Sequence, residues 1–162
     1  MSKRARCPYC DKLFRRDMLD EHVMRCRQER NAPRGRAVRK VVIIDGSNVA
    51  YYLSTDGQPR LENIVTASRS LASVGFVPIV VVSGALIHQI DRDEALADMI
   101  SKRQVIQAPK GTDDDLLIIR TAEEKGADIV SNDRFLDWID RFPWLPSRLR
   151  RYRMSPSGLI LV

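Results

Sequence analysis

The pattern of apolar and polar positions predicts alternating strands and helices from residue 41 onwards. Short apolar runs rich in β-branched residues, typical of strands buried on both faces, lie at residues 41–44, 76–82, 105–107 and 128–131. Apolar residues at helical spacing predict helices over 61–74, 85–102, 113–125 and 133–141. A terminal hairpin is expected over 149–154 and 158–162, with Ser-Pro-Ser-Gly as its turn. This alternation predicts an α/β fold with a mainly parallel central sheet and helices on both faces.

Charge is divided unevenly along the chain. The net charge is +6, and residues 1–40 hold 13 basic and 5 acidic side chains, whereas residues 41–162 hold 14 basic and 16 acidic ones. A basic arm of this kind attracts phosphate backbones or anionic lipid heads. An apolar content of 44% excludes a wholly disordered protein.

Several classes of protein are excluded by simple features. The longest apolar run, FVPIVVV, is far shorter than the ~18 residues that a membrane helix needs. The first residues contain no apolar segment typical of a secretory signal. Three cysteines form a poor disulfide framework and favour a metal site in a reducing compartment. We therefore expect a cytoplasmic protein that does not enter a membrane, and the sequence does not predict its oligomeric state.

Residues 1–30 are expected to form a small ββα-type zinc finger. Its four potential ligands have the spacing Cys-x2-Cys-x11-His-x3-Cys and are Cys7, Cys10, His22 and Cys26. The short first gap suits a tight turn that presents two thiolates, and the last gap places His22 and Cys26 on one helix face. Because four protein ligands leave no open position, the zinc would be structural. A chance cluster of free cysteines is the alternative.

The sequence leaves the partner of the finger open. Its basic residues, Lys12, Arg15, Arg16, Arg25 and Arg27, favour nucleic acid. The finger also resembles small Cys-Cys-His-Cys fingers that bind proteins such as ubiquitin. Residues 31–40, with Pro33, Gly35 and several basic side chains, predict a flexible basic linker.

Acidic residues follow three of the predicted strands. Asp45 ends the first strand, the triplet Asp113–Asp115 opens the helix after the third, and Asp133 follows the fourth. In open parallel sheets, sites form at the carboxyl ends of the strands, so these carboxylates should converge. Asp137 lies four residues after Asp133 and should share its helical face.

Clustered carboxylates repel one another unless a cation compensates them. Mg²⁺ and Mn²⁺ prefer oxygen ligands, and such an ion assists phosphodiester hydrolysis by activating water and stabilising the transition state. The alternative is a purely structural role, in which each acid only caps a helix or ends a turn. Three coincidences at three strand ends make that alternative less favoured.

Three motifs then resemble a known family. The segments VVIIDGSNVAYY, TDDDLLIIRTAEEKGADIVSNDRF and FPWLPSRLRRYRM resemble the NYN-type ribonucleases of the PIN-like superfamily, in the Regnase/MCPIP branch. The similarity covers residues 41–162 and implies a PIN-like three-layer sandwich with Mg²⁺-dependent endoribonuclease activity. It implies catalytic roles for Asp45, Asp114, Asp115, Asp133 and Asp137, with magnesium held by Asp45, Asp115 and Asp133. The resemblance also implies substrate-binding positions at Asn48, Ser131 and Asn132.

Other candidates are weaker, and the chain departs from the family in places. Lys110 and the basic stretch of Arg148, Arg150 and Arg151 are candidate RNA contacts, or else a solvated face. Ser83-Gly84-Ala85 stands where the branch has Pro, an aromatic residue and Arg. The leading hypothesis is a metal-dependent endoribonuclease, and the alternatives are an inactive RNA-binding or adaptor protein and a nuclease that acts on DNA.

Overall fold

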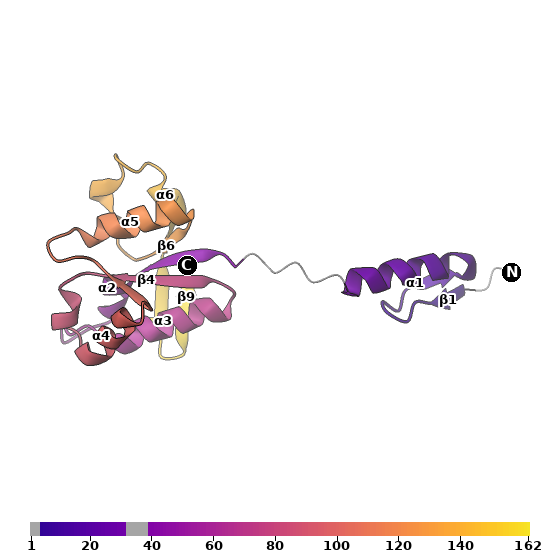
Figure 1. Cartoon of the computed structure of the whole chain (residues 1–162), viewed down its shortest axis with the longest axis horizontal. Helices are drawn as coiled ribbons and strands as arrows, with labels where there is room; N and C mark the ends of the chain where they lie inside the picture. Colours follow the sequence, from indigo (N-terminus) through magenta and orange to yellow (C-terminus); the bar gives the residue numbers. More distant parts are fainter. Residues whose placement is uncertain (1–3, 32–38) are drawn as a thin grey trace. The chain divides into compact units, whose positions relative to one another are not determined.

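The computed structural model describes residues 4–31 and 39–162. They belong to two compact units, which divide between Val38 and Arg39 (Figure 1). Most of the predicted linker, residues 31–40, lies outside the described residues. Within the described residues, no helix is long and apolar enough to cross a membrane.

The small unit is a hairpin followed by a helix. β1 (Arg4–Arg6) pairs antiparallel with β2 (Leu13–Arg15), and α1 (Arg16–Asn31) follows directly. Phe14 turns inward from β2 and stacks on the His22 ring, with 3.8 Å between the ring centroids. The predicted ββα order of the finger is therefore confirmed.

The large unit is built on a five-stranded parallel sheet in the order β5-β4-β3-β6-β7. The sheet places β3, the first strand of this unit, at its centre, and residues 42–45 of β3 are buried. The strands are β3 (Val41–Asp45), β4 (Val77–Val82), β5 (Val105–Gln107), β6 (Asp128–Val130) and β7 (Leu149–Arg150).

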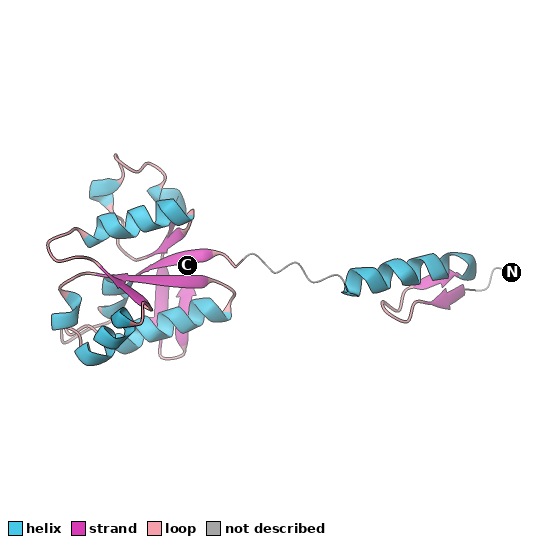
Figure 2. Ribbon diagram, in the orientation of Figure 1, coloured by secondary structure: helices cyan, strands magenta, loops and turns pink. Residues whose placement is uncertain are grey.

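Helices cover both faces of this sheet (Figure 2). One face packs against α2 (Gly46–Ala50), α3 (Leu61–Ser73), the 3-10 turn η1 (Leu86–His88) and α4 (Asp93–Ser101). The other face packs against α5 (Asp114–Lys125), the 3-10 turn η2 (Leu136–Trp138) and α6 (Leu145–Arg148). The hairpin of β8 (Tyr152–Ser155) and β9 (Gly158–Leu161) lies against α3. The predicted three-layer sandwich with a parallel sheet is confirmed.

The predicted helix over 133–141 is wrong. Only the 3-10 turn η2 forms there, because the Asp133 side chain accepts a hydrogen bond from the Phe135 backbone N–H at 2.8 Å. Such a local bond competes with helix formation, and Phe135 adopts a left-handed φ of 50°. Asp133 and Asp137 therefore do not share a helical face.

Two further predicted elements are divided in the structure. The segment 85–102 forms η1 and α4, separated at Asp91, whose carboxylate and backbone N–H bond to Leu61 and Pro59. The segment 149–154 supplies β7 to the parallel sheet before β8 begins the hairpin. The sequence pattern did not predict the short helices α2 and α6.

Candidate active site

Acidic side chains from three strand ends meet at the carboxyl edge of the sheet. Asp45 is the last residue of β3, Asp133 follows β6, and Asp114 and Asp115 begin α5. Asp114 and Asp133 lie close enough to Asp45 for their charges to raise the pKa of its carboxyl group. The predicted convergence therefore occurs for these four residues.

Asp45 is a buried carboxylate held in a fixed orientation. Its side chain is only slightly exposed, and it accepts hydrogen bonds from the Asn48 backbone N–H (3.0 Å to Oδ1) and the Ser131 hydroxyl (2.8 Å to Oδ2). Burial raises its pKa to about 6, and the charges of Asp114 and Asp133 add to this effect, whereas the two hydrogen bonds oppose it. The charged form of Asp45 is thus oriented but costly to maintain.

The three consecutive acids at the start of α5 have different roles. Asp113 is the N-cap, and its Oδ1 accepts hydrogen bonds from the backbone N–H groups of Asp115 (2.9 Å) and Leu116 (3.3 Å). Asp114 and Asp115 are half-buried. Burial, followed by the charges of Asp114 and Asp45, raises the pKa of Asp115 to about 7. The cap explains Asp113 but does not explain the other two.

The donor set of this cluster fits a divalent cation. One carboxylate oxygen from each of Asp113, Asp114 and Asp115 lies within 4.8 Å of the others. Burial, followed by the charges of neighbouring carboxylates, raises the pKa values of Asp45 and Asp115, so positive charge among them would relieve the repulsion. Carboxylate oxygens without nitrogen or sulfur ligands are the set that Mg²⁺ and Mn²⁺ prefer.

A hydrogen-bonded network behind the acids fixes their loops. The Asn48 side-chain oxygen accepts from the Tyr152 hydroxyl (2.8 Å) and from the Asn132 backbone N–H (3.0 Å). The Asn132 side chain donates to the Tyr152 carbonyl and accepts from the Tyr152 backbone N–H, each at 3.1 Å. Ser131 is fully buried, so its hydroxyl supports Asp45 and does not face the surface. These contacts give Asn48, Ser131 and Asn132 positioning roles.

Sequence reasoning missed Tyr152. This tyrosine belongs to β8 and is buried, and burial raises its pKa above the ordinary value. It lies among arginines and 104 residues from Asn48, its hydrogen-bond partner. No local spacing signals such a contact, since only the folded sheet brings the two residues together.

Two hollows open next to the acids. Asp133 and Asp137 line a hollow of about 580 Å³, together with Asn48, Asn132, Arg134 and Leu136. A second hollow of about 680 Å³ includes Asp114, Lys110, Ser83, His88 and Gln107 in its lining. The structure therefore places Asp137 and Lys110 at the rim of the site, where both side chains are exposed.

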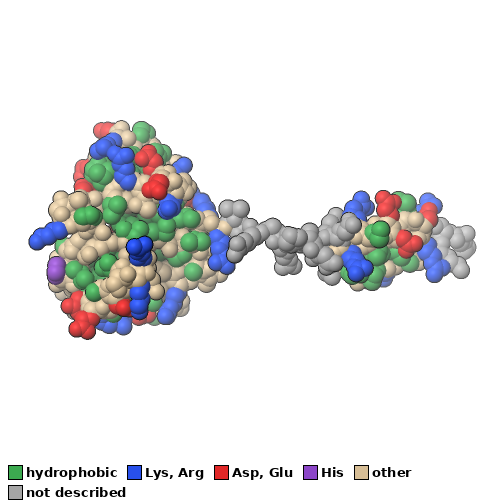
Figure 3. Space-filling model, viewed as in Figure 1, with side chains coloured by type: hydrophobic (Ala, Val, Ile, Leu, Met, Phe, Trp, Pro, Cys, Tyr) green, Lys and Arg blue, Asp and Glu red, His purple; other side chains and the backbone are tan. Residues whose placement is uncertain are grey.

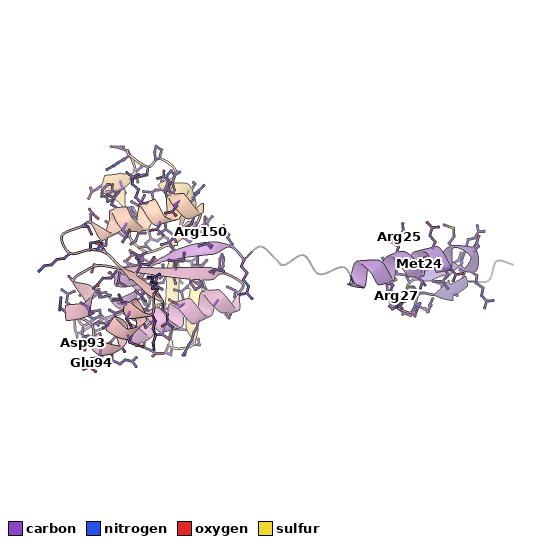
Figure 4. The ribbon with its side chains drawn as sticks, viewed as in Figure 1. Met24, Arg25, Arg27, Asp93, Glu94 and Arg150 are labelled. Carbon is purple, nitrogen blue, oxygen red and sulfur yellow. The ribbon has the colours of Figure 1, made fainter. Side chains whose placement is uncertain are left out.

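The three C-terminal arginines that were candidate RNA contacts have different surroundings. The Nε atom of Arg150 donates to Asp128 Oδ2 at 3.0 Å, so its side chain reaches the first residue of β6, away from the end where Asp133 follows (Figure 4). Lys40 binds the same oxygen at 2.7 Å. The Arg148 guanidinium lies 5.2 Å from the Trp144 ring centroid, and Arg151 is exposed. The Arg150 side chain is engaged within the domain, which does not support the predicted RNA contact.

The small unit holds a second candidate metal site. The ligand atoms of Cys7, Cys10, His22 and Cys26 lie within 4.8 Å of one another, and Cys10 Sγ is 3.2 Å from His22 Nε2. Burial and the neighbouring thiols raise the pKa of Cys26 to about 11. Three cysteines held this close without disulfides fit zinc, which stabilises thiolates together.

Comparisons with known proteins identify the fold and the family of the large unit. Two structures of the nuclear protein-only RNase P 2 (PRORP2) of Arabidopsis thaliana are similar, with TM-scores of 0.61 and 0.60 at 17% and 21% identity. They cover 99% and 88% of this chain, which spans only 41% and 33% of theirs. At this identity the likeness shows the fold, and the comparison with curated proteins found no relative. Residues 38–157 match the model of the Zc3h12a-like ribonuclease NYN domain, and the chain therefore belongs to that family.

Proposed function

We propose that this protein is a Mg²⁺- or Mn²⁺-dependent endoribonuclease. The observation that carries the proposal is the convergence of Asp45, Asp114, Asp115 and Asp133 from three strand ends of a domain in a ribonuclease family. Asp45, Asp115 and Asp133 would hold the ion, and Asp114 adds charge beside them. Bound there, a divalent cation would lower the pKa of water and neutralise charge that develops on the phosphate.

The side chains of the domain orient and support this centre. Ser131 and the Asn48 backbone fix both oxygens of Asp45. Asp133 donates its backbone N–H to Ser131 Oγ at 3.0 Å, which ties two acids through one hydroxyl. Lys110, in the lining of the second hollow, would contact the RNA strand beside the acids, and Asp137, in the lining of the first, would add its carboxylate to the catalytic set. Lys110 would attract the phosphate groups of the RNA.

The finger would retain RNA while the nuclease domain cuts it. Zinc at Cys7, Cys10, His22 and Cys26 would be structural, since the four ligands complete a tetrahedral site. The free cysteines suit the cytoplasm, where thiols stay reduced, and this is the compartment that we propose.

Cleavage assays with single substitutions test the nuclease proposal. Asp45→Asn and Asp115→Asn should each reduce cleavage of labelled RNA at least 100-fold, while Asp140→Asn, an exposed acid outside the cluster, serves as the control. Activity should appear with Mg²⁺ or Mn²⁺ and be absent without either. If Asp45→Asn folds normally and cuts RNA like the parent, the assignment is wrong.

The same assay separates the alternatives. RNA binding without any metal-dependent product indicates an inactive binding protein. Preferential cutting of a matched DNA oligonucleotide indicates a DNA nuclease. Because chelators also strip zinc, divalent ions are omitted rather than chelated, and the zinc content is measured in each sample.

A further inference from the structure

The outward face of the small hairpin carries a basic patch. β1 and β2 alternate, so that Ala5 and Phe14 are half-buried, whereas the residues on the other side are exposed. We name this exposed set the hairpin face, and it consists of Arg4, Arg6, Leu13 and Arg15.

The register of the hairpin places like charges together. Arg4 lies directly opposite Arg15, and Arg6 lies opposite Leu13. Like charges directly opposite across an antiparallel pair are destabilising, and bound phosphate would remove that cost. Leu13 is 50% exposed between the charges and offers an apolar contact to a base or sugar.

Nearby acids only partly balance this face. Arg6 and Arg15 form ion pairs with Asp11 (3.2 Å) and Asp17 (2.7 Å), but all four side chains are more than half exposed. The Arg6 pair is an exposed contact of the kind that contributes little, whereas Arg15 holds Asp17 through two bonds, Nε to Oδ1 at 3.2 Å and Nη2 to Oδ2 at 2.7 Å. A phosphate bound at Arg15 would replace that carboxylate. Within residues 4–31 and 39–162, Arg4 has no ion-pair partner.

The outer face of α1 has a different character. Asp17, Asp20 and Glu21 are exposed in its first half, and acidic side chains lie over α1 in the space-filling view (Figure 3). Further along, Met24 is 68% exposed and projects from the helix with Arg25 and Arg27 (Figure 4). A phosphate backbone laid along this helix would meet the carboxylates of Asp20 and Glu21, while Asp17 is paired with Arg15.

We propose that the hairpin face, and not α1, is the surface through which the finger binds RNA. Arginine guanidinium groups bind phosphate in a bidentate manner, and alternate residues of one strand place them about 7 Å apart. The inference rests on the proposed function for the identity of the polyanion. It adds which surface of the finger makes the contact.

Matched double variants test this surface, with binding measured on the full chain. Both are made in the Asp115→Asn background, so that the RNA stays intact in the presence of Mg²⁺. Arg4→Ala/Arg15→Ala should weaken binding of a single-stranded RNA about tenfold and reduce the salt slope by about 1.4, the value for two phosphate contacts. Arg25→Ala/Arg27→Ala removes the same charge from α1 and should change affinity less than twofold. Fluorescence anisotropy at several salt concentrations gives both quantities.

The RNA affinities of the two double variants distinguish the hairpin face from the alternatives. Equal losses of RNA affinity from the two variants would show that only net charge counts. No loss of affinity from either variant would indicate that the finger binds a protein partner instead. Both results overturn the proposal. If the Arg4→Ala/Arg15→Ala chain loses zinc, Arg4→Gln alone replaces it, with an expected loss of about threefold. If the parent chain never cuts RNA but the hairpin-face substitutions weaken its RNA affinity, the nuclease proposal is wrong and the hairpin face remains the RNA-binding surface.

Discussion

Asp45 and Asp128 are both buried aspartates, yet their surroundings move their pKa values in opposite directions. Asp45 lies among other carboxylates, and its burial raises its pKa to about 6. Burial alone would also raise the pKa of Asp128, but hydrogen bonds from Lys40 and Arg150 hold it below its ordinary value. Asp128 has two cationic partners from the chain, whereas Asp45 would gain one only from the divalent ion that we propose.

The ion pairs of Asp128 should stabilise the fold in a pH-dependent way. Asp128→Asn should lower the free energy of unfolding by about 1–2 kcal/mol at pH 7, a modest value because Lys40 and Arg150 are about half exposed. A depressed pKa in the folded state contributes stability above the unfolded value of about 3.9, and that contribution is lost as pH falls through the folded pKa. The difference between parent and variant should therefore shrink below about pH 4.

Denaturant titrations of parent and Asp128→Asn at pH 7 and pH 3 measure this difference. Equal free energies of unfolding for the parent and Asp128→Asn, at pH 7 as well as at pH 3, would mean that solvent screens the ion pairs completely. The cleavage rate at saturating RNA serves as a second measurement, and it should change little, because Asp128 lies at the start of β6, away from the end where Asp133 follows.

At the scale of elements, the junction of β3 and α2 determines where Asp45 sits. Gly46 follows Asp45 and approaches β4 closely, because a Cβ there would lie 2.7 Å from Val80 Cγ1, 2.7 Å from Val82 Cγ1 and 2.9 Å from Val81 O. Gly46→Ala should therefore push the start of α2 away from the sheet. Overpacking of this kind costs about 1–3 kcal/mol.

The same substitution should also reduce cleavage, since it displaces Asp45 and the Asn48 N–H that orients it. Gly57→Ala provides the comparison: its added methyl meets nothing within 4 Å, and its φ of 74° costs about 1–2 kcal/mol. Denaturant titrations and cleavage rates should separate the two, with lost stability in both and lost activity only for Gly46→Ala. Normal cleavage by Gly46→Ala would show that the junction tolerates movement.

The elements that the sequence predicted well are those whose signal is local. The strand at 41–44 is a run of four β-branched residues, and it becomes the central strand of the sheet. The helix predicted over 113–125 forms as α5, because Asp113 caps its start and Gly126, with a left-handed φ of 60°, ends it. Asp45, Asp115 and Asp133 were predicted to converge because parallel strands bring their carboxyl ends to one edge.

The failures have non-local or competing causes. Residues 133–141 carry apolar side chains at helical spacing, but the turn at Asp133 prevents a helix. Arg150 belongs to a basic run, yet its partner Asp128 is 22 residues earlier in the chain and on the adjacent strand. Tyr152 and Asn48 are 104 residues apart in the chain, and only the folded domain brings them into contact. A sequence pattern reports the periodicity of one segment and not the partner across the sheet.

At the scale of the whole molecule, the uneven charge predicts how RNA binding responds to salt. Residues 1–40 carry 13 of the 27 basic side chains with only 5 of the 21 acids, and the body from residue 41 has a slight acidic excess. Under the proposed function, acids gathered around a cation would not repel RNA as free carboxylates do. The body would then bind RNA locally, while the arm would supply counterion release. The affinity of the full chain should therefore fall steeply with salt.

Residues 39–162 form a compact unit with their own core, and can be compared with the full chain. Each phosphate contact to a single strand contributes about 0.7 to the slope of log affinity against log salt. If the arm makes about four contacts, the slope of the full chain should exceed that of residues 39–162 by about 3. In the Asp115→Asn background with Mg²⁺ present, anisotropy titrations between 50 and 300 mM salt measure both slopes. Equal slopes would place the phosphate contacts in the body and remove the arm from RNA binding.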